Sequence, residues 1–90
     1  MLLVTYELGG AGRDDAPFLA AIQVLGPAAR PLRTTFLVDT LLNAAQAYAV
    51  LEDCLDKDKG DRMLVVEINA ANRQGWAPKA VWDFISARET

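Results

Sequence analysis

Histidine is absent from this 90-residue sequence, and cysteine occurs once, at position 54. The first absence excludes mechanisms that need a histidine base or a histidine metal ligand. A lone cysteine can form no internal disulfide, so we expect a reducing cytoplasm and an inert, partly buried Cys54. No apolar run reaches the roughly 18 residues of a membrane span, and the first residues do not resemble a secretion signal. We therefore expect a soluble protein with no membrane partner.

Basic residues are also few. Nine Lys and Arg stand against twelve Asp and Glu, which gives a formal net charge of -3. Nonspecific nucleic-acid binding relies on an excess of Lys and Arg, so this balance weakens it. Hydrophobic residues make up 52% of the chain and charged residues 23%, which indicates a globular protein. At this length we expect one domain, small enough for association with a partner to help its stability.

Alternation of apolar and polar residues predicts four strands, and apolar residues at helical spacing predict three helices. The strands are expected at residues 2–8, 28–32, 33–39 and 62–69. The second is a weak edge strand because it contains a proline. The helices are expected at residues 16–25, 41–55 and 78–88. Asp15, or Asp14, is suited to cap the first helix, Thr40 the second, and Pro78 to begin the third.

The order of these elements predicts an α+β protein with a ferredoxin-like split βαβ fold over residues 1–90. The expected sheet is antiparallel or mixed, with two helices on one face and an added C-terminal helix. Within it, we expect the first and third strands to run parallel at the centre. A three-layer flavodoxin-like unit is the rival fold. It is disfavoured because the strands are too few and too polar for a sheet buried on both faces.

The other face of the expected sheet has no helix assigned to it. We place the more apolar set of strand residues under the two helices: Leu2, Val4, Tyr6, Phe36, Val38, Leu64, Val66 and Ile68. The opposite set then forms an open face: Leu3, Thr5, Glu7, Thr35, Leu37, Asp39, Met63, Val65 and Glu67. Since this face is too apolar to be left in water, we expect a homodimer partner or the C-terminal helix to cover it.

Four stretches resemble known proteins: LVTYEL with GRDD, PLRTTFLVDT, MLVVEI and GWAPKAVWDFI. Together they are similar to small bacterial proteins labelled SinR-like. More widely, they resemble the superfamily of the small CRISPR spacer-acquisition subunit and the virulence-associated protein D ribonucleases. The resemblance covers nearly the whole chain and implies a ferredoxin-like homodimer. In that superfamily the first strand ends in a Tyr-Asp pair, and the Asp of each subunit is proposed to bind a divalent metal at the interface.

The matching pair in this sequence is Tyr6-Glu7. The resemblance therefore implies Glu7 as a ligand for Mg²⁺ or Mn²⁺, through its carboxylate oxygens. Glutamate is one methylene longer than the aspartate of the superfamily, which changes the geometry available to the metal.

Glu7 and Asp39 are the candidate catalytic residues. In the expected topology both lie at the C-terminal ends of parallel strands and point to one face. Four carboxylates would then converge in a dimer, as in a two-metal phosphodiesterase. The alternative is a solvated rim, or contacts with Arg13 or Arg33, since such ion pairs are common and contribute little.

Other conspicuous residues have structural interpretations. The glycine-rich GGAGRDD matches no phosphate-binding spacing, so we interpret it as a turn. Trp76 and Trp82 could stack on bases, but an apolar helical pattern with few basic neighbours favours the core.

Two functions stay open. The first is a non-catalytic dimeric module that binds a nucleic acid or a protein, in which the acidic residues are structural. The second is a weak metal-dependent endonuclease, acting on RNA or DNA, with Glu7 holding the metal and Asp39 assisting. The acidic balance and the Glu in place of Asp favour the first.

Overall fold

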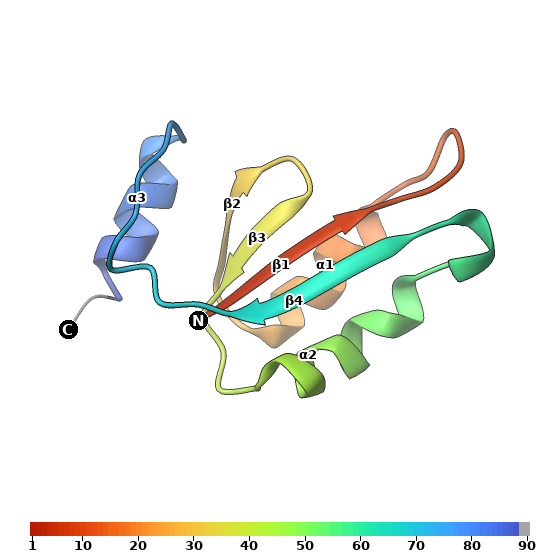
Figure 1. Ribbon diagram of the computed structural model, residues 1–90, viewed down its shortest axis with the longest axis horizontal. Coiled ribbons are helices and arrows are strands. Elements are labelled where there is room, and N and C mark those ends of the chain that lie inside the picture. Colours follow the sequence, from red (N-terminus) through yellow and green to blue (C-terminus); the bar gives the residue numbers. More distant parts are fainter. Residues whose placement is uncertain (89–90) are drawn as a thin grey trace.

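The structure is a computed structural model that describes residues 1–88. Its elements follow the chain in this order: β1 (Leu2–Glu7), α1 (Ala16–Leu25), β2 (Ala28–Leu32), β3 (Thr35–Val38), α2 (Ala44–Leu51), the short 3-10 helices η1 (Glu52–Cys54) and η2 (Lys57–Lys59), β4 (Arg62–Glu67) and α3 (Lys79–Ser86). Helices α1 and α2 lie on one face of the sheet, and α3 lies apart from them beside β2 (Figure 1). No helix in residues 1–88 is long and apolar enough to cross a bilayer.

The four strands form one sheet in the order β2-β3-β1-β4, and every neighbouring pair is antiparallel. This confirms the α+β class and is compatible with a ferredoxin-like fold. The expectation that the first and third strands run parallel is wrong, since Leu2 pairs with Val38 and Thr5 with Thr35. A crossover through α1 leaves β2 parallel to β1. The tight hairpin after β2 reverses the chain, so β3 enters between them in the opposite direction.

The main core lies between the sheet and helices α1 and α2. Tyr6 stacks on Phe18 of α1 with ring centroids 4.6 Å apart, and Phe36 of β3 lies on the other side of Tyr6 at 6.3 Å. Other members are almost fully buried: Leu2, Val4, Ile22, Val38, Ala47 and Leu51. The residues of β1 and β3 therefore face the helices as their alternation predicts.

Strand β4 has the opposite orientation to the one predicted. Val65 pairs with Val4 and Met63 with Tyr6, so these two residues pack against the helix-face core. Leu64 and Val66 point to the open face and are 57% and 38% exposed. The run MLVV is apolar on both sides, so its pattern does not choose a face, and pairing with β1 sets the register instead.

Helix α2 begins three residues later than predicted. Asn43, rather than Thr40, is its cap: the Asn43 side chain accepts from the Gln46 amide at 2.8 Å, and the Gln46 side chain accepts from the Asn43 amide at 2.9 Å. This reciprocal pair is a capping box, which satisfies two helix-end donors at once. The predicted helix through residue 55 ends as an α-helix at Leu51 and continues as η1.

Helix α3 covers part of the open face. Val81 and Ile85 pack on Leu37 of β3 in a small second core. Trp82 is only partly buried and donates from its ring nitrogen to the Ala77 carbonyl at 3.1 Å. The predicted core position of Trp76 is wrong, because this side chain is 99% exposed in the loop before α3. Leu3 of β1 packs at the border of this second core, whereas no helix of residues 1–88 covers Leu64 and Val66 of β4.

Candidate functional site

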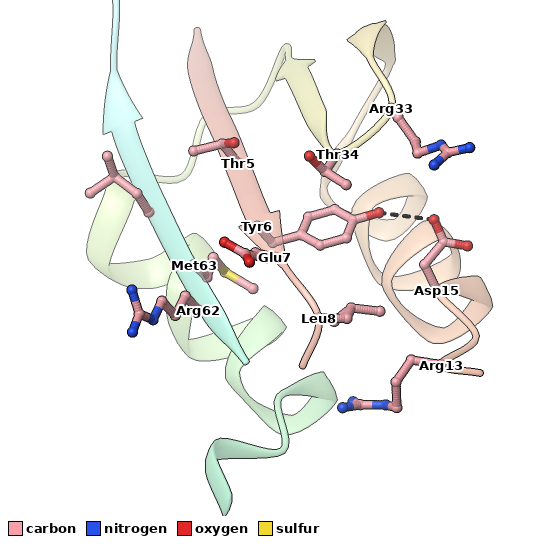
Figure 2. A pocket seen from close by; sticks show the side chains of 11 residues that line it. Thr5, Tyr6, Glu7, Leu8, Arg13, Asp15, Arg33, Thr34, Arg62 and Met63 are labelled. Atoms are coloured by element: carbon pink, nitrogen blue, oxygen red, sulfur yellow. Dashed lines mark hydrogen bonds between the residues drawn. The ribbon is translucent and has the colours of Figure 1, made fainter. Parts of the chain in front are cut away.

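A depression of about 670 Å³ opens where β1 ends (Figure 2). The Tyr6 amide donates to the Thr34 carbonyl at 3.0 Å, and beyond this point the turn before β3 moves away from β1. The gap is bordered by the β1–α1 loop and by the start of β4. Its charged lining residues are Glu7, Arg13, Asp15, Arg33 and Arg62. We call this depression the cleft. It is lined by Tyr6 and Glu7, the pair singled out in the sequence.

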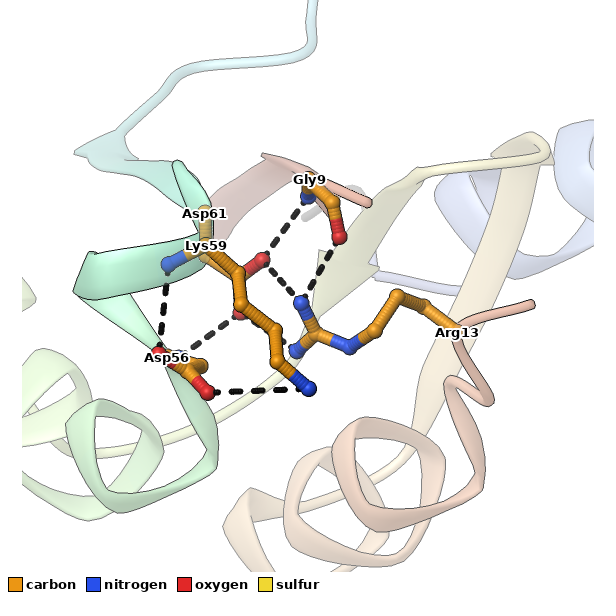
Figure 3. Close-up of polar contacts among 5 residues, drawn as sticks. All are labelled: Gly9, Arg13, Asp56, Lys59 and Asp61. Atoms are coloured by element: carbon orange, nitrogen blue, oxygen red, sulfur yellow. Dashed lines mark hydrogen bonds and ion pairs between the residues drawn. The ribbon is translucent and has the colours of Figure 1, made fainter. Parts of the chain in front are cut away.

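Arg13 and Asp61 form the most buried ion pair of the site (Figure 3). The two terminal nitrogens of Arg13 donate to the two carboxylate oxygens of Asp61 at 2.8 and 2.7 Å. Arg13 also donates to the Gly9 carbonyl at 2.8 Å. Two parallel charge-assisted bonds fix both direction and distance, so the β1–α1 loop is held against the loop that precedes β4.

Asp61 is an acceptor for backbone donors as well. The amides of Gly9 and Asp56 donate to its two oxygens at 2.8 and 2.7 Å, and its side chain has no exposed surface. The Arg13 guanidinium, helped by these two amides, holds the pKa of the Asp61 carboxyl well below its usual range. Asp61 is therefore charged at any physiological pH and is a structural anchor rather than a proton donor.

Tyr6 is held by a second polar chain. Its hydroxyl donates to Asp15 at 3.1 Å, and Asp15 accepts from Arg30 at 3.0 Å. Arg30 in turn donates to the Arg33 carbonyl and lies over the Phe36 ring. Burial, together with the hydrogen bond to the Asp15 carboxylate, raises the pKa of Tyr6 to about 12. The hydroxyl stays protonated at neutral pH, so Tyr6 is no base here.

Glu7 lies at the mouth of the cleft and is exposed. It pairs in register with Arg62 of β4, so both side chains start from the open face of the sheet. Figure 2 shows the Arg62 guanidinium directed away from Glu7. Within residues 1–88, neither side chain has an ion-pair or hydrogen-bond partner. Glu7 thus has an unengaged carboxylate, as a metal ligand or an intermolecular contact requires.

Asp39 lies far from this cleft, which corrects the expectation that it joins Glu7. Because β3 runs antiparallel to β1, the end of β3 lies beside the start of β1, where Val38 pairs with Leu2. Asp39 accepts there from Arg88 at 2.9 Å, and the Arg88 guanidinium lies over Phe84 of α3. One copy of the chain therefore does not bring Glu7 and Asp39 together, and Asp39 connects α3 to the sheet.

The remaining acidic residues near the cleft are engaged by the chain itself. Asp14 accepts from the Ala16 amide at 2.9 Å at the start of α1. Asp15 and Asp61 are bound by arginines, as described above. No group of three acidic or cysteine side chains suited to a metal is present in the described part of the chain. Of the lining carboxylates, Glu7 is thus the one open to a divalent cation.

The sequence analysis missed the Arg13–Asp61 pair. Its partners are 48 positions apart, and neither belongs to a periodic segment. The sequence contained one indication of this pair: Asp61 directly precedes a predicted strand, and a charged side chain at such a position can become buried. The expectation for Cys54 fits the structure: the thiol is partly buried, donates weakly to the Pro17 carbonyl at 3.6 Å, and has its pKa raised by that burial.

Comparison of the chain with protein-family models, with curated proteins and with solved structures gives no match. The family resemblance described above stays a prediction.

Proposed function

We propose that this protein is a non-catalytic binding module that works as a homodimer. Its partner surface is the bare half-face, defined as the open-face residues of β1 and β4: Leu3, Thr5, Glu7, Arg62, Leu64 and Val66. Leu3 lies at its border, where it also packs against the cluster of Leu37, Val81 and Ile85. The main support for the proposal is the exposure of two apolar side chains within β4, a strand paired with β1. Leu64 is 57% exposed and Val66 is 38% exposed. Adjacent exposed apolar side chains on a regular sheet are typical of an interaction surface.

The other half of the open face supports this interpretation. There Leu37 is only 6% exposed because Val81 and Ile85 of α3 pack on it. Leu37 was expected to be covered by a partner or by the C-terminal helix, and the helix covers it. Within residues 1–88, α3 thus covers the β3 side of this face as far as Leu3, and no element covers Leu64 and Val66. A second copy of the chain supplies a matching bare half-face.

The distribution of positive charge favours a protein partner over a nucleic acid. Six cationic side chains lie in ion pairs with acidic side chains: Arg13, Arg30, Lys57, Lys59, Lys79 and Arg88. Binding to phosphates would require these pairs to be broken or shared. With a net charge of -3, the chain offers little to attract a nucleic-acid backbone.

A metal-dependent endonuclease is the alternative function. It requires the Glu7 carboxylates of two copies to meet, because Asp39 lies at the other end of the sheet. No contact within residues 1–88 favours this arrangement over the binding module. Glu7 as a Mg²⁺ or Mn²⁺ ligand therefore stays a prediction from the resemblance.

Sedimentation velocity at micromolar concentration tests the proposed module. The wild-type chain should sediment as a dimer, and Leu64→Glu should sediment as a monomer because a charge would be buried in the interface. Leu41→Glu is the matched control, since Leu41 is fully exposed in the loop between β3 and α2. It should stay dimeric. A monomeric wild type, or a dimer that Leu64→Glu leaves unchanged, would contradict the proposal.

A further inference from the structure

We infer that the dimer has a two-fold axis running parallel to the strands, midway between β1 and β4, so that Glu7 of each copy pairs with Arg62 of the other. This inference rests on the proposed function, because it specifies how the second copy sits on the bare half-face.

The register of β1 and β4 determines which open-face residues are neighbours. Three cross-strand pairs lie side by side on the open face: Leu3 with Val66, Thr5 with Leu64, and Glu7 with Arg62. The bare half-face is therefore a strip two residues wide. It is apolar at the end formed by Leu3 and Val66, mixed in the middle and charged at the end formed by Glu7 and Arg62. Its two charges have opposite sign and belong to different strands.

The charges of Glu7 and Arg62 are unsatisfied within residues 1–88. Neither Glu7 nor Arg62 has an ion-pair or hydrogen-bond partner there, and both are exposed. By contrast, Asp15, Asp39 and Asp61 all lie in ion pairs with arginines. The one open carboxylate of the cleft thus neighbours an unpaired guanidinium, on the surface that lacks cover.

Symmetry then decides which residues meet. Rotation by half a turn about an axis between the two strands exchanges β1 with β4 and leaves each residue at its own level along the strands. Glu7 of one copy then faces Arg62 of the other, Thr5 faces Leu64, and Leu3 faces Val66. Facing sheets lie about 10 Å apart, a gap that a glutamate and an arginine side chain reach across together. Two ion pairs and a set of apolar contacts result.

An axis placed over β1 gives a different dimer. It brings Glu7 against Glu7, and the like charges repel unless a cation lies between them. That is the arrangement which the metal-dependent alternative needs. The two axes are mutually exclusive, so charge reversal and metal dependence distinguish them.

The position of α3 fits the axis between β1 and β4. This helix packs on the β2–β3 side of the open face, through Leu37 (Figure 1). The second copy's sheet would lie in the same layer as α3, with its β4 edge next to the helix. Strand β4 is the edge of the sheet and carries no proline. Uncovered edges of this kind invite unwanted strand pairing, and α3 of the partner would cover this one.

Charge reversal tests this axis, with dimer dissociation constants measured by sedimentation equilibrium. Glu7→Arg and Arg62→Glu should each weaken the dimer about tenfold or more, because each places like charges in contact twice per dimer. The double variant Glu7→Arg/Arg62→Glu should return to within about threefold of the wild type. Arg33→Glu is the matched control, since Arg33 lines the cleft but lies outside the bare half-face, and it should change the constant little.

The outcomes separate the axis from the proposed function. A wild-type dimer in which the double variant fails to recover would overturn the axis and leave the binding module standing. A wild-type dimer that Mn²⁺ tightens, with the effect lost in Glu7→Gln, would place the axis over β1 and overturn the inference. A wild-type monomer would overturn the inference and the proposed function together.

Discussion

Arg13 and Asp61 meet through two parallel hydrogen bonds of 2.8 and 2.7 Å although they are 48 positions apart in the sequence. Figure 1 shows that the two loops they connect lie side by side at one end of the molecule. Asp61 also accepts a hydrogen bond from the amide of Gly9, which lies two residues after the end of β1 at Glu7. The pair therefore determines where the cleft and the charged end of the bare half-face lie.

Replacing Asp61 should destabilise the fold more than replacing an exposed acid. Asp61→Asn leaves the Arg13 guanidinium partly buried without its counter-charge, which is costly. Asp83→Asn is the control, because Asp83 forms an exposed ion pair with Lys79, a kind that contributes little. Thermal unfolding should show a clear drop in melting temperature for Asp61→Asn and almost none for Asp83→Asn. Equal drops would mean that the loop pair has no special role.

The same pair predicts a pH dependence. The folded state holds the pKa of Asp61 below its unfolded value, so the stabilisation is fully present above pH about 4 and is lost as pH falls through the lower, folded pKa. The stability difference between wild type and Asp61→Asn should thus be constant near neutrality and shrink on acidification below pH 4. A difference that shrank between pH 8 and 6 instead would point to another titrating group.

Gly9 should not tolerate a side chain. A Cβ at this position would lie 1.8 Å from the Lys59 carbonyl oxygen, so the two loops would have to separate. Gly9→Ala should cost about 1 to 3 kcal/mol in the free energy of unfolding, as overpacking does. Gly75→Ala is the control, because its nearest contact would be the Trp82 ring at 4.0 Å. Chemical denaturation of both variants checks this, and equal stability would contradict the close approach.

Helix α3 should contribute to stability through Ile85 rather than through Trp82, or through Trp76 in the loop before it. Ile85 is 6% exposed against Leu37, whereas Trp76 is fully exposed and Trp82 only partly buried. Ile85→Ala should cost about 2 to 5 kcal/mol, and the exposed Ser86→Ala less than about 0.5 kcal/mol. If denaturation showed no cost for Ile85→Ala, the helix would not be held on the sheet as described.

Glu7 separates the two functions. The binding module predicts that purified protein with Mg²⁺ or Mn²⁺ cleaves RNA or DNA no faster than Glu7→Gln, a variant that keeps the size and hydrogen-bonding capacity of the side chain. Gel assays over several hours would detect weak activity. Metal-dependent cleavage that Glu7→Gln abolishes would establish the endonuclease instead. Cleavage that persists unchanged in Glu7→Gln would belong to another site or to a contaminant.

Much of the fold follows from local patterns. The alternation in β1 and β3, the proline of β2 and the helical spacing around Phe18 each act within one segment, so their elements appear where predicted. Strand β4 differs because MLVV is apolar on both faces. Its orientation is fixed by pairing with β1, a long-range effect that no local pattern contains. The antiparallel direction of β3, by contrast, follows from the α1 crossover and the hairpin after β2, so the predicted order of elements already contained it.

The candidate site was likewise predictable only where a local sequence pattern determines the position of a residue. The position of Tyr6-Glu7 at the end of β1 follows from the strand pattern and the glycines after it. The separation of Asp39 from Glu7 depends on strand direction, and the burial of Asp61 depends on an arginine from a distant loop. The burial of Asp61 is a tertiary relationship, and a charged residue outside a periodic segment leaves little trace of it in a single sequence.

In the proposed dimer, a second copy of the chain covers the bare half-face. Isotope-filtered NMR on a mixture of ¹³C-labelled and unlabelled protein can detect this arrangement, because the experiment records only contacts between copies. We predict intermolecular contacts from the Leu64 methyl groups to Thr5, and from the Val66 methyl groups to Leu3. Spectra with no intermolecular contact to Leu64 or Val66, at concentrations where the protein is dimeric, would mean that another surface forms the dimer.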